Sequence, residues 1–348
     1  MNDDADYLWD RSGDDPELAR LERALAGFAH DAPLREPWRR RRRGLVVSAL
    51  VVAAAAAVVL ALALGRDRPR AELARGPDAA PAGALACAGG DGFPFQVRGG
   101  LARCDGGAAP DGARGVLRVG AWLETEPGAT ADLQVADIGA IRLRAASRLR
   151  LVASGPDQHR LELARGRLSA QVTAPPRLFV IDTPVGAAVD LGCAYDLSVD
   201  DAGRTHLRVT AGAVSLEGRG HAAWVPWGYE VDAEPGRGPG TPRRSDAPER
   251  LRAAVLAFDA AAGEGAAAGA ALSVILDDAG AADAPLLWNL LPRTAGGDRA
   301  AVFARLDELT LRPEWVLDED VLAAEPVALE RWRQSLEGER NVGGWDAP

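Results

Sequence analysis

Residues 160–163 read Arg-Leu-Glu-Leu, and the same alternation of charged and apolar residues occurs on both sides of them. Residues 148–151 read Arg-Leu-Arg-Leu, and residues 206–209 read His-Leu-Arg-Val. A period of two is typical of half-buried strands, because successive side chains of a strand point to opposite faces. Breaks rich in Gly and Asp separate these segments at short intervals. The pattern predicts an all-β domain of sandwich or jelly-roll character over residues 115–233, with no helix between its strands.

Composition and charge narrow the class of protein. The chain has 348 residues, of which 47% are apolar and 26% charged, so it has enough apolar material for buried cores. Asp and Glu (50) outnumber Lys and Arg (40), which gives a net charge of −10 and argues against a nucleic-acid partner. Four His and three Cys are scattered along the chain, so we expect no zinc site.

A long apolar run predicts a single transmembrane helix over residues 44–65. Leu45–Leu64 has Ser48 as its only polar residue. At about 1.5 Å per residue it is roughly 30 Å long, the thickness of a bilayer core. Arg39–Arg43 lie just before it and fewer arginines follow it, so the positive-inside rule predicts a cytoplasmic N-terminus and an exported C-terminal part. A cleavable signal peptide is the alternative, because residues 61–63 fit a cleavage site, although such segments are usually shorter.

The predicted cytoplasmic arm, residues 1–43, contains one amphipathic segment. An acidic start with Pro16 predicts a helix over residues 15–29. Its apolar residues fall on one stripe and are the expected partner-binding residues: Leu18, Leu21, Leu25 and Phe28. A short lone helix is marginal in water, so the stripe favours a bound partner, and a weakly ordered arm is the alternative.

Two stretches rich in Gly and Pro predict linkers, an exported one at residues 66–114 and a second at residues 234–245. After the second linker the period becomes helical, which predicts a small helical module at residues 246–337 and a tail at residues 338–348. The apolar stripes of its four expected helices are Leu251, Val255, Phe258 and Ala262; Leu286, Leu287, Leu290 and Leu291; Val302, Leu306 and Leu309; and Leu329, Trp332 and Leu336. Trp288, Trp315 and Trp332 are the expected core anchors.

Three cysteines have different expected roles. Cys87 and Cys104 lie in the exported linker, where a disulfide would close a loop of about seventeen residues and stabilise the fold by about 3 kcal/mol. Two free thiols are the alternative. Cys193 lies in an apolar segment, so we expect a buried structural thiol rather than a nucleophile.

Several segments of the β domain carry a family resemblance. The opening strand is Val116–Thr125, a Gly turn precedes the strand at residues 141–143, and residues 161–168 form the next pair. Residues 179–186 then lead to Gly-Cys-Ala-Tyr at residues 192–195, before a closing pair at residues 209–214. In this order the segments resemble the FecR family of envelope proteins, which usually has Thr and Phe where this chain has Cys193 and Tyr195.

The resemblance implies a fold, a location and a function. FecR-like proteins have a jelly-roll β domain and cross the bacterial inner membrane once, with the bulk of the chain in the periplasm. Their exported domain receives a signal, often from an outer-membrane transporter, and their cytoplasmic segment controls a sigma factor. The expected partners are therefore the bilayer, a sigma factor and an envelope protein. The cytoplasmic segment of the family is about twice as long as the present arm.

No motif for catalysis or cofactor binding is recognisable in the sequence. There is no Gly-x-Ser-x-Gly, His-Glu-x-x-His or phosphate-binding loop. His159 and His206 are expected on the exposed side of strands, and the acidic pairs at residues 200–201 and 277–278 in loops. We therefore expect no enzyme, no catalytic or metal residues and no cofactor. The predicted function is signal sensing with relay to the cytoplasm, and the alternative is a tethered envelope scaffold or ligand-binding module.

Overall fold

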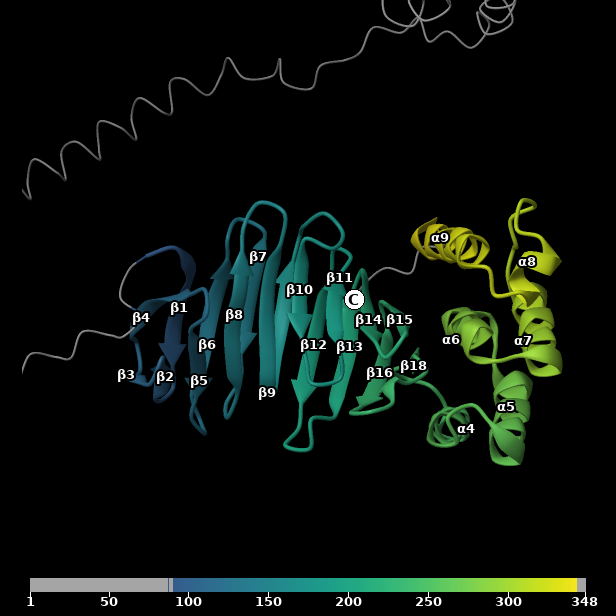
Figure 1. The fold of residues 1–348 in the computed structure, drawn as a ribbon, viewed down its shortest axis with the longest axis horizontal. Helices are drawn as coiled ribbons and strands as arrows, with labels where there is room; N and C mark the ends of the chain where they lie inside the picture. The colour runs from purple at the N-terminus through teal and green to yellow at the C-terminus, as the bar shows by residue number, and fades with distance from the viewer. Residues whose placement is uncertain (1–86, 88–89, 343–348) are drawn as a thin grey trace, which may run out of the picture. The chain divides into compact units, whose positions relative to one another are not determined.

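The computed structural model of the chain describes residue 87 and residues 90–342 (Figure 1). A strand-rich domain is followed by helices, which confirms the predicted order of a β domain and a helical module. The arm at 1–43, the span at 44–65 and the stripe with Leu21 and Leu25 all lie outside the described residues. Among the helices that the structure describes, none has the length and apolar character needed to span a bilayer.

The first of two sheets is antiparallel throughout. Its strands in spatial order are β4 (Arg114–Arg118), β1 (Gly92–Arg98), β6 (Thr130–Val135), β7 (Gly139–Leu143), β9 (His159–Val172), β12 (Ala194–Val199), β13 (Thr205–Ala211) and β16 (Tyr229–Glu234). Two short strands pair with the last one, namely β17 (Gly238–Pro239) and β18 (Arg243–Arg244).

The second sheet contains one parallel pair, β9 with β10, and is otherwise antiparallel. Its strands in spatial order are β3 (Gly107–Ala109), β2 (Ala102–Cys104), β5 (Trp122–Thr125), β8 (Arg148–Ser154), β9, β10 (Phe179–Asp182), β11 (Ala187–Asp190), β14 (Ala213–Gly218) and β15 (His221–Pro226).

Strand β9 belongs to both sheets. Its first half pairs with β8 and β10, and its second half pairs with β7 and β12. The change falls at Gly166, where φ is +94° and an added Cβ would lie 2.2 Å from Ser147 Oγ. Only glycine fits this backbone conformation and this close approach without strain. Gly166 therefore lets one continuous strand of fourteen residues join the two sheets.

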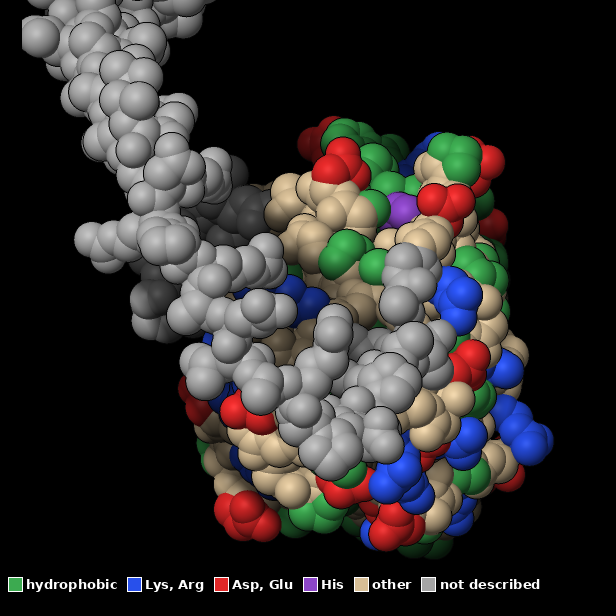
Figure 2. Space-filling model, turned by 90° about the vertical axis from the view of Figure 1, so that its left-hand side faces the viewer, with side chains coloured by type: hydrophobic (Ala, Val, Ile, Leu, Met, Phe, Trp, Pro, Cys, Tyr) green, Lys and Arg blue, Asp and Glu red, His purple; other side chains and the backbone are tan. Residues whose placement is uncertain are grey.

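The core of the β domain follows from the alternation in the sequence. Leu149, Leu151, Leu161 and Leu163 are fully buried, as are the inward residues of β13. Inward side chains of both sheets belong to one continuous apolar core, which confirms the period-two prediction. Figure 2 shows the end of the domain that carries β1 to β4, where the visible arginines and carboxylates are interspersed and apolar groups form small separate areas.

Both predicted linkers were wrong over the residues that the structure describes. Residues 92–114 contribute β1, β2, β3 and the start of β4, because Phe93, Phe95 and Val97 alternate into the core. Residues 234–245 contain β17 and β18 along the edge strand β16, a position where Pro is tolerated. The β domain therefore begins near Gly92 and is continuous with the helices.

The helical module contains α4 (Glu249–Ala260), α5 (Gly265–Asp278), α6 (Ala284–Leu290), α7 (Gly296–Leu309), α8 (Asp318–Leu322) and α9 (Pro326–Val342), with short 3₁₀ turns at Ala281–Asp283 and Leu291–Arg293. The four predicted helices correspond to α4, α6, α7 and α9, and the residues of their apolar stripes are buried with two exceptions. Leu309 is half-buried, and Ala262 lies beyond the end of α4 with a φ of +55°. Helix α5 was not predicted, so residues 277–278 lie at its end rather than in a loop. The tail prediction was wrong up to residue 342, where α9 ends.

The three tryptophans expected as anchors have different environments. Trp332 is fully buried, and the Phe303 ring lies edge-on to it at 5.9 Å. Trp288 is half-buried and its Nε1 donates to the Leu329 carbonyl at 2.9 Å. Trp315 is 66% exposed, so its prediction as a core anchor was wrong. The adjacent Val316 is buried in its place.

Helix α6 closes the free edge of the second sheet. The Trp224 N–H of β15 donates to Asn289 Oδ1, and Asn289 Nδ2 donates to the Trp224 carbonyl, both at 2.9 Å. The side-chain amide thus replaces a neighbouring strand. The Trp224 ring lies edge-on to Trp288 at 5.6 Å, and its Nε1 donates to Glu337 of α9. These contacts fix the helices to the sheet.

Candidate functional site

The outer face of the first sheet carries a polar row that crosses six strands. Strand register places its members side by side, and most of them alternate in charge: Asp132, Arg142, Ser169, Asp196, Arg208 and Glu230. Neighbouring side chains on one face of an antiparallel pair lie about 5 Å apart, so opposite charges in register stabilise each other. The alternation that buries leucines on one face therefore creates a charged row on the other, which is open to solvent except at buried Glu230.

An open groove of about 1200 Å³ lies on this face, over β9, β12, β13 and β16. Its polar lining includes Arg144, Arg167, Asp196, Ser198, His206 and Asp232. Ser169 donates to Asp196 Oδ1 at 2.6 Å, and Arg144 lies 3.3 Å from the Ser169 hydroxyl. These bonds hold the floor of the groove in one arrangement.

Two arginines of this face are exposed and form no ion pair with any carboxylate in the described part of the chain. Neither Arg167 on β9 nor Arg208 on β13 makes a side-chain hydrogen bond or ion pair with the described residues. By contrast, Arg98 and Arg142, further along the face, both bind Asp132, at 2.8 and 2.7 Å. Free guanidinium donors suit carboxylate or phosphate groups. The groove therefore offers donors to a polar or anionic surface.

One end of the groove is fixed by a network around Asp232 of β16. His206 Nδ1 lies 2.7 Å from one Asp232 oxygen, and Arg243 donates to the other at 2.6 Å. Burial alone would raise the pKa of Asp232, but these two bonds hold that pKa at about 2. Arg243 is almost fully buried and also contacts buried Glu230 at 3.1 Å. Arg252 of α4 lies 3.6 Å from the Glu230 carboxylate, so the network ties β18 and the start of the helical module to the groove.

A second buried network sits beside the first. Asp259 of α4 accepts from the Thr241 N–H at 2.8 Å and from the Thr241 hydroxyl at 2.7 Å. Arg293 donates to the same carboxylate at 2.6 Å. The segment predicted as a linker is therefore anchored by charge-assisted hydrogen bonds, which are stronger than neutral ones.

The described residues provide no reactive centre. Cys193 is buried, and its thiol donates to the fully buried Asp190 at 2.6 Å. Burial, together with the neighbouring Asp190, raises the pKa of Cys193 well above its usual range, so the thiol stays protonated. This confirms the prediction of a structural thiol. Among the described residues no group of three or more His, Cys, Asp or Glu side chains could hold a metal ion.

The structure places the histidines and cysteines that the sequence singled out, and it adds two arginines that the sequence did not. His206 is half-exposed in the groove, whereas His159 is buried against the Phe93 ring, so the expectation of an exposed His159 was wrong. Cys87 is joined in a disulfide to Cys104, the last residue of β2, which is the first of the two alternatives that the sequence left open. Arg167 and Arg208 were missed as candidates, and the available signal was their outward position in alternating strands.

Comparison with known proteins identifies part of the β domain. A family model described as FecR protein matches residues 121–215, from the residue before β5 into β14. The chain is therefore FecR-like over these residues, a similarity that supports a regulator of signal transduction. No curated protein matches the chain.

Two crystal structures of a candidate anti-sigma factor from Parabacteroides distasonis ATCC 8503 are similar to part of the chain. Each shares 16% sequence identity with it, with a TM-score of 0.33. The similarity covers 39% of this chain and 64% of the chain in those structures.

Proposed function

We propose that the chain is a membrane-anchored regulator whose FecR domain receives a signal in the bacterial periplasm and relays it to a cytoplasmic partner such as a sigma factor. The FecR domain at residues 121–215 is the observation that carries the proposal. The apolar run Leu45–Leu64 provides the single inner-membrane span, with the N-terminus in the cytoplasm. The disulfide beside β2 suits an exported, oxidising location.

The relay has two contact surfaces. On the periplasmic side, the groove with its free Arg167 and Arg208 meets an envelope protein. On the cytoplasmic side, the stripe of Leu18, Leu21, Leu25 and Phe28 holds the partner, because an amphipathic helix buries its apolar face in a groove of its target. A signal that changes the contact between the groove and the envelope protein would change the binding of the cytoplasmic partner to the leucine stripe.

The test is a crosslinked pull-down of the full chain from membranes beside a Leu21→Asp, Leu25→Asp variant. The matched control is Ala19→Asp, Ala26→Asp, which helical spacing places off the stripe. We expect the unaltered chain and the control to capture a sigma factor and the stripe variant to lose it. If all three capture the same envelope proteins and no cytoplasmic protein, the relay is refuted and the chain is a tethered scaffold or ligand-binding module.

A further inference from the structure

Large exposed apolar side chains gather in one short segment of the helical module. Seven such side chains are exposed in the described part of the chain, and five of them lie between residues 311 and 327. They are Leu311 (79% exposed), Trp315 (66%), Leu317 (49%), Leu322 (41%) and Val327 (55%). Single exposed apolar residues scattered over a surface are normal, whereas five of seven within one segment of seventeen residues make that segment a candidate interaction site. We refer to these five residues as the Trp315 patch.

The segment that carries the patch is held firmly. Val316 and Val321 are buried, so Trp315 and Leu322 point outward while their neighbours point into the core. The Arg312 guanidinium packs over the Phe303 ring at 5.2 Å and donates to the Val316 carbonyl. The backbone of the patch is therefore fixed by contacts with the core, and the exposure of its side chains belongs to the folded state.

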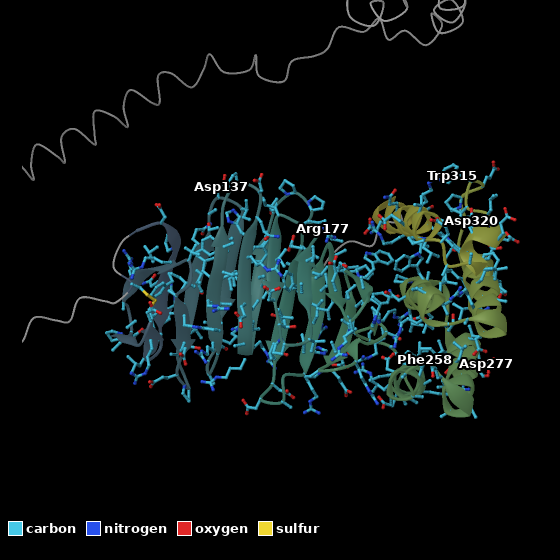
Figure 3. The ribbon with its side chains drawn as sticks, in the orientation of Figure 1. Asp137, Arg177, Phe258, Asp277, Trp315 and Asp320 are labelled. Carbon is cyan, nitrogen blue, oxygen red and sulfur yellow. A yellow bond between two sulfur atoms is a disulfide. The ribbon has the colours of Figure 1, made fainter. Side chains whose placement is uncertain are left out.

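The charges around the patch are mainly acidic. Glu314 and Glu319 are exposed and Asp320 is half-exposed, and none of the three has an ion-pair partner among the described residues. Arg312 is neutralised by Asp307 and Asp318, both at 2.8 Å. After Arg312, the next basic residue along the chain is Arg331, one helical turn after Val327. Figure 3 shows Trp315 and Asp320 on the outer side of the module, away from the β domain.

We propose that the Trp315 patch binds a protein segment with apolar anchors flanked by Arg or Lys. Trp supplies large contact area and dominates interface energies, and its ring attracts an arginine at the edge of the contact. The unpaired carboxylates favour a basic partner through charge complementarity. They also disfavour a second copy of this chain, because a symmetric contact would bring Glu314 and Glu319 against their own equivalents.

The site is separate from the groove on the first sheet, and it lies outside the residues that match the FecR family. The proposal therefore does not depend on the signalling function. A tethered scaffold would use the same patch. Failure to capture a sigma factor would not argue against peptide binding by the Trp315 patch. Failure of peptide binding would not argue against the signalling relay.

The test is a selection of displayed random peptides on the detergent-solubilised full chain, with counter-selection on a Trp315→Asp variant. We expect the enriched peptides to place Arg or Lys beside apolar residues. Trp315→Ala should weaken binding of an enriched peptide at least tenfold. Glu314→Gln with Glu319→Gln should weaken it several-fold and reduce its salt dependence. Leu256→Ala, an exposed apolar residue on α4, is the matched control and should bind unchanged.

Three results would overturn the proposal. The first is a selection with no binder specific to the unaltered chain. The second is enrichment of acidic or uncharged peptides. The third is self-association in sedimentation that Trp315→Ala abolishes, which would assign the patch to a second copy of the chain. Because Trp315 is exposed, its substitution should leave the thermal unfolding temperature unchanged, so a folding defect does not obscure the result.

Discussion

The Asn289 side chain provides the sharpest test of how the helices complete the β domain. Its amide binds both the N–H and the carbonyl of Trp224 in β15, and it also donates to the Pro285 carbonyl at 2.7 Å. Asn289 is 3% exposed and Trp224 is also 3% exposed, so water cannot replace these bonds. Removing the amide leaves two buried backbone groups of β15 without a partner.

The expected loss follows from the cost of an unsatisfied buried group. At about 1–3 kcal/mol for each of two groups, Asn289→Leu should lower the free energy of unfolding by about 2–6 kcal/mol. A loss of about 3 kcal/mol corresponds to a fall of roughly 6–12 °C in the unfolding temperature of a domain of this size. Leucine has the branched shape of asparagine and the same number of side-chain heavy atoms, so the substitution creates no cavity and the loss reports the missing hydrogen bonds.

The assay combines thermal unfolding with hydrogen exchange of the Trp224 amide. We expect this amide to exchange faster in the variant, because it loses its acceptor. Gln334→Leu removes an exposed amide from α9 and is the matched control, with an expected change below about 0.5 kcal/mol. If Asn289→Leu were as stable as the unaltered chain and the Trp224 amide stayed protected, the edge-closing role of Asn289 would be refuted.

Three further predictions concern the β domain. Gly166→Ala should cost more than about 2 kcal/mol or abolish soluble expression, because of its positive φ and its approach to Ser147, while Gly155→Ala, which has open space, should be tolerated. Reducing the disulfide should lower the free energy of unfolding in denaturant by about 3 kcal/mol. Because its pKa is lowered, the Asp232 carboxylate adds to the free energy of unfolding above about pH 4, and this contribution is lost as the pH falls toward 2. In Asp232→Asn the free energy of unfolding should therefore depend less on pH between about 2 and 4.

The strands of the β domain were predictable wherever alternation was strict. Leu161 and Leu163 are buried and their charged neighbours are not, as a period of two requires. The same signal was present in Phe93, Phe95 and Val97, but the surrounding Gly and Pro residues suggested a linker. Sequence did not indicate that one strand serves both sheets, because the need for Gly166 arises from contact with a residue distant in the chain.

The groove and the closed edge depend on long-range register, which a single sequence does not contain. Arg208 lies beside Asp196 only because β12 and β13 pair in that alignment. Asn289 was recognisable as a polar residue within an apolar helix, and such a residue needs a buried partner. Its partner, Trp224, is 65 residues away, and nothing local identifies it.

The closed edge also decides where a protein can contact the β domain. Strand addition needs free N–H and carbonyl groups, and in the middle of β15 Asn289 already occupies those of Trp224. The face of the first sheet remains open, and the guanidinium groups of Arg167 and Arg208 have no partner among residues 90–342. We expect Arg167→Gln with Arg208→Gln, which remove the guanidinium donors without placing a third carboxylate between Asp196 and Glu230, to reduce crosslinked capture of envelope proteins severalfold. Arg103→Gln, at an exposed position on the second sheet, should leave capture unchanged. If the groove variant captured as much envelope protein as the unaltered chain, the groove would be excluded as the contact surface. The candidate contacts would then be the strand edges that lie far from the helices.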